Sequence, residues 1–155
     1  MIEIKKGKAS GKVIVPPSKS YAHRLLIAAA LTNKKCCVTN IELSNDIHAT
    51  INCLETLGKQ VTFDNNKVIV ETLKNFNELD DVLIFNCLES GSTLRFFIPL
   101  ALTLGKTVIF KGTEKLISRG ISVYEEICAK QNIKVIIEQN QITFNGLLKP
   151  DTFNI

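Results

Sequence analysis

The chain has 155 residues, 45% of them hydrophobic, and a formal net charge of +4. This composition is typical of a globular protein with a sizeable core and excludes a low-complexity chain. The basic residues are scattered rather than gathered in a run, so nucleic-acid binding is only weakly indicated. No apolar stretch approaches the length of a membrane span, and residues 1–6 lack the apolar centre of a signal peptide, so we expect a cytoplasmic protein.

The first half of the chain predicts five elements. The first is a strand at 13–15, taken together with the apolar run 2–4. An alanine-rich helix follows the serines at 18 and 20, and a strand follows at 35–38. A helix with Ile47, Ile51 and Leu54 ends before Gly58 and leads to a hairpin of 61–63 and 68–70 around the polar turn 64–66.

The second half repeats this order. A helix follows residues 90–92, a strand is predicted at 106–109, a helix carries Val123, Tyr124 and Ile127, and a hairpin joins 135–137 to 142–144. Arg24 and Arg95 occupy corresponding places near the start of the first helix of each half. We therefore predict an α/β fold with two copies of a strand-helix-strand-helix-strand-strand unit, over approximately residues 13–73 and 82–146.

The five cysteines include the adjacent pair Cys36 and Cys37, and no two have Cys-x-x-Cys spacing. An odd number without that spacing favours neither a disulfide framework nor a zinc site. We expect free thiols, most of them buried as small core residues.

Two loops of small residues each precede an apolar helix with a cation in its early turns. The first is Ser-Lys-Ser at 18–20, with Arg24, and the second is Ser-Gly-Ser at 90–92, with Arg95. A helix N-terminus offers unpaired N–H donors and a partial positive charge, and both favour a phosphate or carboxylate. Two such loops predict an anionic ligand held from two sides.

Three ordered motifs carry a family resemblance. Residues 15–20 (Val-Pro-Pro-Ser-Lys-Ser) with Arg24, residues 89–95 (Glu-Ser-Gly-Ser-Thr-Leu-Arg) and residues 112–119, which end in Arg119, resemble the 5-enolpyruvylshikimate-3-phosphate synthase family. The resemblance covers nearly the whole chain. It implies part of the three-unit N-terminal domain of an inside-out α/β barrel, with no metal and no organic cofactor.

The resemblance also implies a reaction and its site. The family transfers the enolpyruvyl group of phosphoenolpyruvate to the 5-hydroxyl of shikimate 3-phosphate and releases phosphate, in the pathway to chorismate and the aromatic amino acids. Lys19, Ser20 and Arg24 would bind shikimate 3-phosphate. Lys19, Gly91 and Arg119 would bind phosphoenolpyruvate, with Arg95 as a further candidate. Lys19 would be a binder first, and a proton donor only if its pKa is lowered.

The chain departs from the family pattern in length and at two positions. It matches roughly the first third of these enzymes, so we expect residues 1–155 to be a truncated N-terminal domain, inactive alone, without the third unit and the second domain. Glu89 stands where Asn is common and must point away from the anion or pair with a cation such as Arg95. Gly120 replaces a usual Pro.

Without the third unit, an apolar face would be left open and would favour self-association. This face is predicted to include Leu25, Leu26, Ala29, Phe96, Phe97 and Leu100.

Other interpretations stay open. A relative of the transferase that acts on UDP-N-acetylglucosamine would share the architecture, and a non-catalytic anion-binding module would share the loops. For His23, a solvent-facing or packing role is favoured over general-base chemistry, because one residue along a helix turns it away from Arg24. His48 is expected on a helix surface, and Asp46 as a helix cap.

Overall fold

The computed structural model describes residues 7, 8 and 10–153, which fold into helices and strands in mixed order. In the first half they are α1 (Lys19–Ala30), β1 (Cys36–Thr39), α2 (Asn45–Thr56), β2 (Lys59–Asp64) and β3 (Lys67–Thr72). The second half has η1 (Phe76–Glu78), β4 (Val82–Asn86), α3 (Gly91–Leu102), β5 (Thr107–Lys111), α4 (Glu114–Ile117), α5 (Ser122–Lys130), β6 (Lys134–Ile137) and β7 (Gln141–Asn145).

The strands form two separate sheets. The first has the order β1-β3-β2, with both pairs antiparallel, and the second has the order β4-β5-β7-β6. In the second sheet β4 and β5 are parallel and joined by α3, while β5–β7 and β7–β6 are antiparallel. A parallel pair needs such a crossover helix, whereas each antiparallel hairpin needs only a short turn. The strands β1, β3 and β2 therefore have the same order and directions as β5, β7 and β6.

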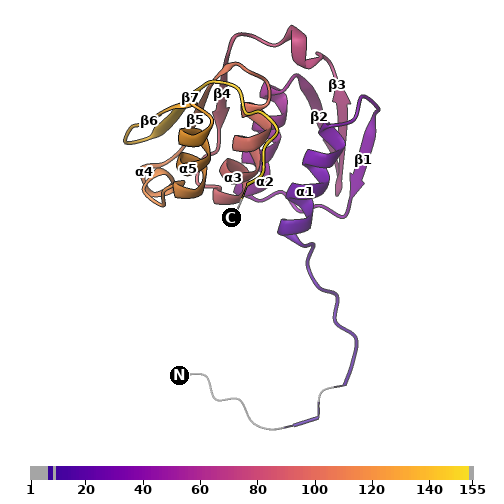
Figure 1. Ribbon diagram of the computed structural model, residues 1–155. Coiled ribbons are helices and arrows are strands. Elements are labelled where there is room, and N and C mark those ends of the chain that lie inside the picture. Colours follow the sequence, from indigo (N-terminus) through magenta and orange to yellow (C-terminus); the bar gives the residue numbers. More distant parts are fainter. Residues whose placement is uncertain (1–6, 9, 154–155) are drawn as a thin grey trace.

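Helices α1, α2 and α3 lie between the two sheets (Figure 1). Helix α2 packs against β2 on one side and β4 on the other, α1 packs against β1 and β3, and α3 packs against β5. The core continues through all of these layers. Its second half is built on aromatic rings, with Phe85 stacked on Phe110 at 4.9 Å between centroids and Phe144 edge-on to Phe110 at 5.9 Å.

Gly58 makes the sharp connection from α2 into β2. Its φ is +74°, and a Cβ at this position would lie 2.8 Å from Cβ of Lys74. Only glycine combines this left-handed conformation with so close a neighbour. The helix stop that the sequence predicted at Gly58 is confirmed, and so are the helices and hairpins predicted in both halves.

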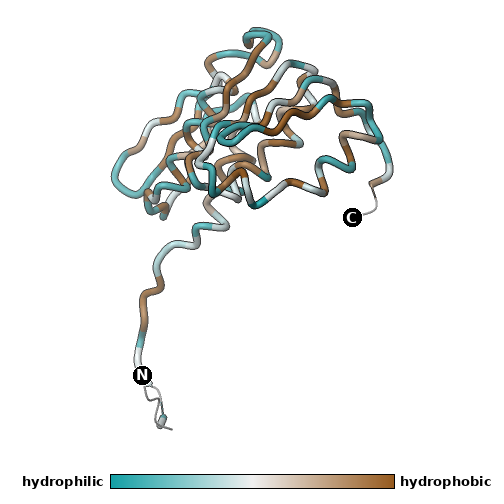
Figure 2. The backbone as a smooth tube through the Cα atoms, turned by 90° about the vertical axis from the view of Figure 1, so that its left-hand side faces the viewer, coloured by the Kyte–Doolittle hydropathy of each residue, from teal (hydrophilic) through white to brown (hydrophobic). Residues whose placement is uncertain are grey.

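The predicted strand at 13–15 is wrong for this structure. Val13, Ile14 and Val15 are 82%, 90% and 75% exposed and pair with no strand in the described part of the chain. Figures 1 and 2 show this segment leaving the body of the molecule ahead of α1, with a hydrophobic stretch along it. Pro16 and Pro17 hold the backbone extended but supply no N–H for a sheet. The apolar run 2–4 lies outside the described residues.

The prediction of free thiols, most of them buried, is confirmed. Cys53, Cys87 and Cys128 are buried, Cys36 is half-buried and Cys37 is exposed. The neighbouring Cys87 thiol and burial both raise the pKa of Cys53, so this thiol stays protonated and unreactive.

Among the described residues, no helix is long and apolar enough to cross a bilayer.

Candidate functional site

The N-terminus of α3 is held firmly by the loop that precedes it. Cys87 N–H donates to the carbonyl of Lys111 at 2.8 Å, and Thr113 N–H donates to the carbonyl of Leu88 at 2.9 Å. Ser90 then caps the helix, since its hydroxyl accepts from Thr93 N–H at 3.2 Å. The first N–H groups of a helix have no partner within it, so α3 presents them, with its partial positive charge, beginning at Gly91.

Two guanidinium groups converge on Gly91. A Cβ at this position would lie 3.0 Å from Nη1 of Arg95 and 3.5 Å from Nη1 of Arg119. Arg95 is anchored, because it donates to the carbonyls of Gly91 at 3.4 Å and Gly120 at 3.3 Å. Tyr124 of α5 donates its hydroxyl to the carbonyl of Arg95 at 2.7 Å. A side chain at Gly91 would press against the Arg95 guanidinium, so glycine lets two cations lie beside the helix N-terminus, an arrangement that favours an anion.

This cluster borders a pocket of about 530 Å³. Its lining residues are Asp46, Glu89, Gly91, Ser92, Arg95, Phe96 and Arg119. Glu89 forms no ion pair with Arg95 within the described residues, because the Arg95 guanidinium is turned to backbone carbonyls. Of the two expectations for Glu89, pairing with Arg95 is therefore wrong. Arg95 itself, a further candidate from the sequence, lies in the pocket with Gly91 and Arg119.

The cationic residues of α1 form a second group. Arg24 donates to the Ser20 hydroxyl at 2.5 Å and to the Ser20 carbonyl at 3.0 Å, one helical turn away. Lys19 reaches across to α2, and its ammonium lies 2.5 Å from Oδ2 of Asp46. The structure thus places Ser20 and Arg24 in contact on α1 and adds a carboxylate, Asp46, to Lys19.

The two groups meet at the edges of the pocket. Asp46 lines the pocket and pairs with Lys19, while Phe96 lines it and lies under the Arg24 guanidinium, 4.9 Å from ring centroid to Cζ. Arg24 and Lys19 therefore flank the anion pocket of α3. A doubly anionic ligand could contact cations from both helices at once.

Sequence reasoning missed the role of Asp46. Ser44 caps α2 instead, since its hydroxyl accepts from Ile47 N–H at 3.4 Å, and Asp46 falls in the first helical turn, facing Lys19. Both residue types are good caps, and Ser44 stands earlier in the chain, so the pattern itself offered the correct choice.

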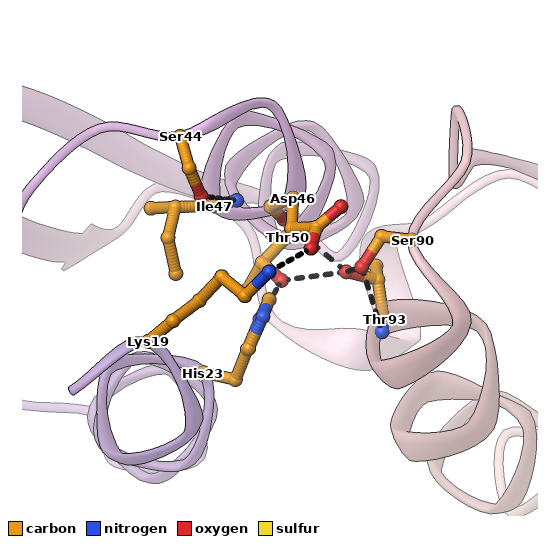
Figure 3. Close-up of polar contacts among 8 residues, drawn as sticks. All are labelled: Lys19, His23, Ser44, Asp46, Ile47, Thr50, Ser90 and Thr93. Carbon is orange, nitrogen blue, oxygen red and sulfur yellow. Dashed lines mark hydrogen bonds and ion pairs between the residues drawn. The ribbon is translucent and has the colours of Figure 1, made fainter. Parts of the chain in front are cut away.

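His23 occupies an unexpected environment. It is 1% exposed, which fits the packing alternative, but its Nδ1 lies 2.7 Å from the Thr50 hydroxyl on α2 (Figure 3). Burial lowers the pKa of His23, Asp46 opposes this, and the Lys19 and Arg24 charges add to it. His48 is exposed on α2, as predicted.

The apolar face predicted on α1 and α3 is only partly open. Leu26 and Phe97 are fully buried and Ala29 is 8% exposed, so these three belong to the core and the prediction is wrong for them. Leu25 is 49% exposed, and Phe96 and Leu100 are half-buried. Helical periodicity placed all six on apolar helices but could not tell which side each sheet covers.

Comparison with known proteins shows the family of this chain. Residues 4–146 match the family model of EPSP synthase (3-phosphoshikimate 1-carboxyvinyltransferase). The 3-phosphoshikimate 1-carboxyvinyltransferases of Clostridium kluyveri and Clostridioides difficile are each 38% identical over 99% of this chain, which covers 36% and 38% of them. The chain therefore spans just over a third of the length of these curated relatives.

A solved structure shares the fold. The EPSP synthase of Acinetobacter baumannii, at 19% identity, superposes with a TM-score of 0.70 over 88% of this chain and 32% of that one. The mixed α/β architecture described above thus matches one part of a larger protein. Because the family model matches residues 4–146, most of its length, the chain belongs to the EPSP synthase family.

Proposed function

We propose that the pocket at the N-terminus of α3 binds phosphoenolpyruvate through Gly91, Arg119, Arg95 and Lys19. The observation that carries this proposal is the convergence of the Arg95 and Arg119 guanidinium groups beside Gly91, at the unpaired N–H groups of a helix. Phosphoenolpyruvate has a phosphate and a carboxylate, and each can accept two parallel hydrogen bonds from an arginine.

The α1 group binds shikimate 3-phosphate in this proposal. Ser20 and Arg24 already contact each other and stand on the exposed side of α1, beside the pocket. Lys19 lies between the two ligands, since its partner Asp46 lines the pocket. An incoming phosphate would compete with Asp46 for the Lys19 ammonium, because the side chains of the pair are 56% and 31% exposed and the pair is weak.

The whole enzyme would transfer enolpyruvyl from phosphoenolpyruvate to the 5-hydroxyl of shikimate 3-phosphate and release phosphate. The cations gathered here would offset repulsion between two phosphates and a carboxylate, a stabilisation that grows in a site with little water. Lys19 acts first as a binder and second as a candidate proton donor. Tested alone, residues 1–155 are expected to bind ligands without turnover.

Five cysteines suit a reducing compartment, so we also propose that the protein is located in the cytoplasm.

We further propose that the chain consists of two units, approximately 13–73 and 82–146, of a domain with three. The matching order and directions of β1-β3-β2 and β5-β7-β6 support this. The partly exposed Leu25, Phe96 and Leu100 would then lie on the face that a third unit covers, and residues 1–155 alone would self-associate there. Sedimentation as a monomer at high concentration would contradict the self-association.

The phosphoenolpyruvate site is tested by NMR titration of the ¹⁵N-labelled chain. Phosphoenolpyruvate should shift the amides of Gly91 and Ser92, and Arg119→Gln should weaken binding by about tenfold or more. Lys115→Gln removes a cation from α4, the short helix that precedes Arg119, outside the pocket, and should leave the affinity within about twofold. Equal weakening by both variants would mean that only net charge matters.

The shikimate 3-phosphate site needs a separate titration. Shikimate 3-phosphate should shift the amides around Ser20 and Arg24, and Ser20→Ala with Arg24→Gln should abolish the effect while Lys34→Gln does not. Protection by a UDP-sugar instead would favour the nucleotide-sugar transferase relative. A response to inorganic phosphate equal to that of both substrates would favour the non-catalytic anion-binding module.

A further inference from the structure

A row of four polar side chains crosses the core between α1, α2 and α3 (Figure 3). Its members are His23 on α1, Thr50 on α2, and Thr93 and Ser90 at the start of α3, and they are between 0% and 2% exposed. The steps are 2.7 Å from His23 Nδ1 to Thr50 Oγ1, 2.8 Å from there to Thr93 Oγ1, and 2.7 Å from Thr93 Oγ1 to Ser90 Oγ. The row therefore joins α1, which follows the first anion loop, to Ser90, the residue that caps α3 in the second.

The direction of these hydrogen bonds follows from His23. Its Nε2 is buried and has no hydrogen-bond partner in the described part of the chain. A buried N–H without an acceptor is rare, so we assign the hydrogen to Nδ1 and a lone pair to Nε2. Nδ1–H then donates to Thr50, and Thr50 donates to Thr93. Thr93 has two acceptors, and we assign its hydrogen to Ser90 Oγ at 2.7 Å rather than to the more distant Asp46 carbonyl at 3.3 Å. Every hydroxyl in the row has a partner, and every bond points from α1 towards α3.

We propose that His23 is a positioning residue, which holds the Ser90–Gly91 loop at a fixed distance from the Lys19–Arg24 turn through Thr50 and Thr93. Ser90 caps α3 with the same oxygen that ends the row, so its placement sets where the Gly91 N–H points. The role of this spacing in binding two anions rests on the function proposed above. The positioning itself concerns the free protein and can be tested separately.

A simple packing role would not require this chemistry. Leucine fills a similar volume without burying polar atoms, whereas a buried imidazole and hydroxyls are tolerated only when their hydrogen bonds are made. The charged groups near His23 are Asp46, Lys19 and Arg24, and burial together with the two cations keeps the imidazole neutral. Neutral His23 has the single donor that the row uses. Protonation would add a buried N–H at Nε2, beside two cations.

Two substitutions at one position separate positioning from packing. His23→Asn places an amide nitrogen close to the position of Nδ1, so it can still donate to Thr50, while His23→Leu fills the space without a donor. The first readout is the set of Ser90, Gly91 and Ser92 amide shifts in the ligand-free, ¹⁵N-labelled chain. The second is the dissociation constant for phosphoenolpyruvate, with inorganic phosphate as the reference anion.

His23→Leu should shift the three amides, although they lie on a different helix, and weaken phosphoenolpyruvate binding by about tenfold. His23→Asn should restore both to near the wild-type values. Unchanged amides and affinity in a folded His23→Leu chain would overturn the proposal. If wild type binds neither anion, the proposed function fails, while the amide shifts still decide whether His23 positions the loop.

A measurement on the wild-type chain covers the case in which His23→Leu does not fold. The imidazole ¹⁵N shifts should show a hydrogen on Nδ1 and none on Nε2 at neutral pH. Hydrogen on Nε2 would reverse the direction of the row and overturn the assignment. Thr93→Val, which breaks the row at its next-to-last member, should shift the Ser90 and Gly91 amides in the same sense as His23→Leu.

Discussion

The two halves of the molecule start from similar sequences but hold their anion loops differently. In the second half, β4 pairs with β5, and the loop from Cys87 to Ser90 is tied to Lys111 and Thr113 by backbone hydrogen bonds. In the first half, the segment before α1 pairs with no described strand, and Ser18, Lys19 and Ser20 are exposed. The loop at α3 is therefore organised before any ligand arrives, whereas the loop at α1 is held through the contact of Lys19 with Asp46 on α2.

This difference shows that a motif needs a fixed strand behind it to become a rigid site. Ser90 and Ser18 both cap a helix, yet Ser90 is 2% exposed and Ser18 is exposed. The contacts that hold α1 come from its sides, through Lys19 to Asp46 and through His23 to Thr50. We therefore expect ligand binding to order the α1 loop more than the α3 loop.

The largest expected effect tests the rigid half. Phe110→Ala removes a fully buried ring that packs on Phe85 and Phe144, and should lower the free energy of unfolding by about 3–5 kcal/mol in urea titrations. Val13→Ala, in the exposed segment, should change it by less than about 0.5 kcal/mol. A large cost at Val13 would mean that this segment packs in solution, and the contrast between the halves would disappear.

Thr50→Val tests the connection between the halves. The substitution keeps the shape of the side chain but leaves His23 Nδ1–H without its acceptor and Thr93 without its donor. A loss of about 1–3 kcal/mol of unfolding free energy is expected, because both groups stay buried. The matched control is Thr62→Val on the exposed face of β2, which should be nearly neutral. Similar results at both positions would show that the polar row contributes no net stability.

The pH dependence should report on His23. Burial holds the pKa of His23 in the folded chain below the ordinary histidine value of 6.5, so the unfolded chain binds the proton more readily. Stability is therefore fully present above pH 6.5 and falls on acidification below it, by at most about 1.4 kcal/mol per pH unit. His23→Asn should flatten this part of the profile in urea titrations from pH 5 to 7.5. His48→Gln, at an exposed position on α2, is the matched control.

The smallest effect on stability is expected at Asp46. Asp46→Asn removes a partly exposed ion pair with Lys19 and should change the unfolding free energy by less than about 1 kcal/mol. Phosphate binding should nevertheless tighten by about threefold, because Lys19 is released and a negative charge leaves the pocket wall. Calorimetric titration with phosphate measures this, and Asp64→Asn, on β2, is the control. Weaker phosphate binding in Asp46→Asn would show that Asp46 positions Lys19 for the anion.

Local patterns predicted most of the elements. The polar turns 64–66 and 139–141 lie between β-branched residues, and both became hairpins. The one-turn helix α4 and the 3-10 turn η1 were not predicted, because elements of this length have too few residues to show periodicity. The strand at 13–15 was predicted from composition, but its apolar side chains have no partner in the described part of the chain.

The sequence by itself determined most of the elements, the family and the residue types of the candidate site, because spacing, caps and turns are local properties. Only the tertiary structure decided which of these residues meet. Arg95 and Arg119 reach the same glycine because α4 and its C-terminus fold back beside α3, and Asp46 meets Lys19 because α2 packs against α1. The environment of His23 was also decided there, since its acceptor stands 27 residues away on another helix. Contacts between elements depend on how the layers pack, and a local pattern does not specify which residues distant in the sequence will meet.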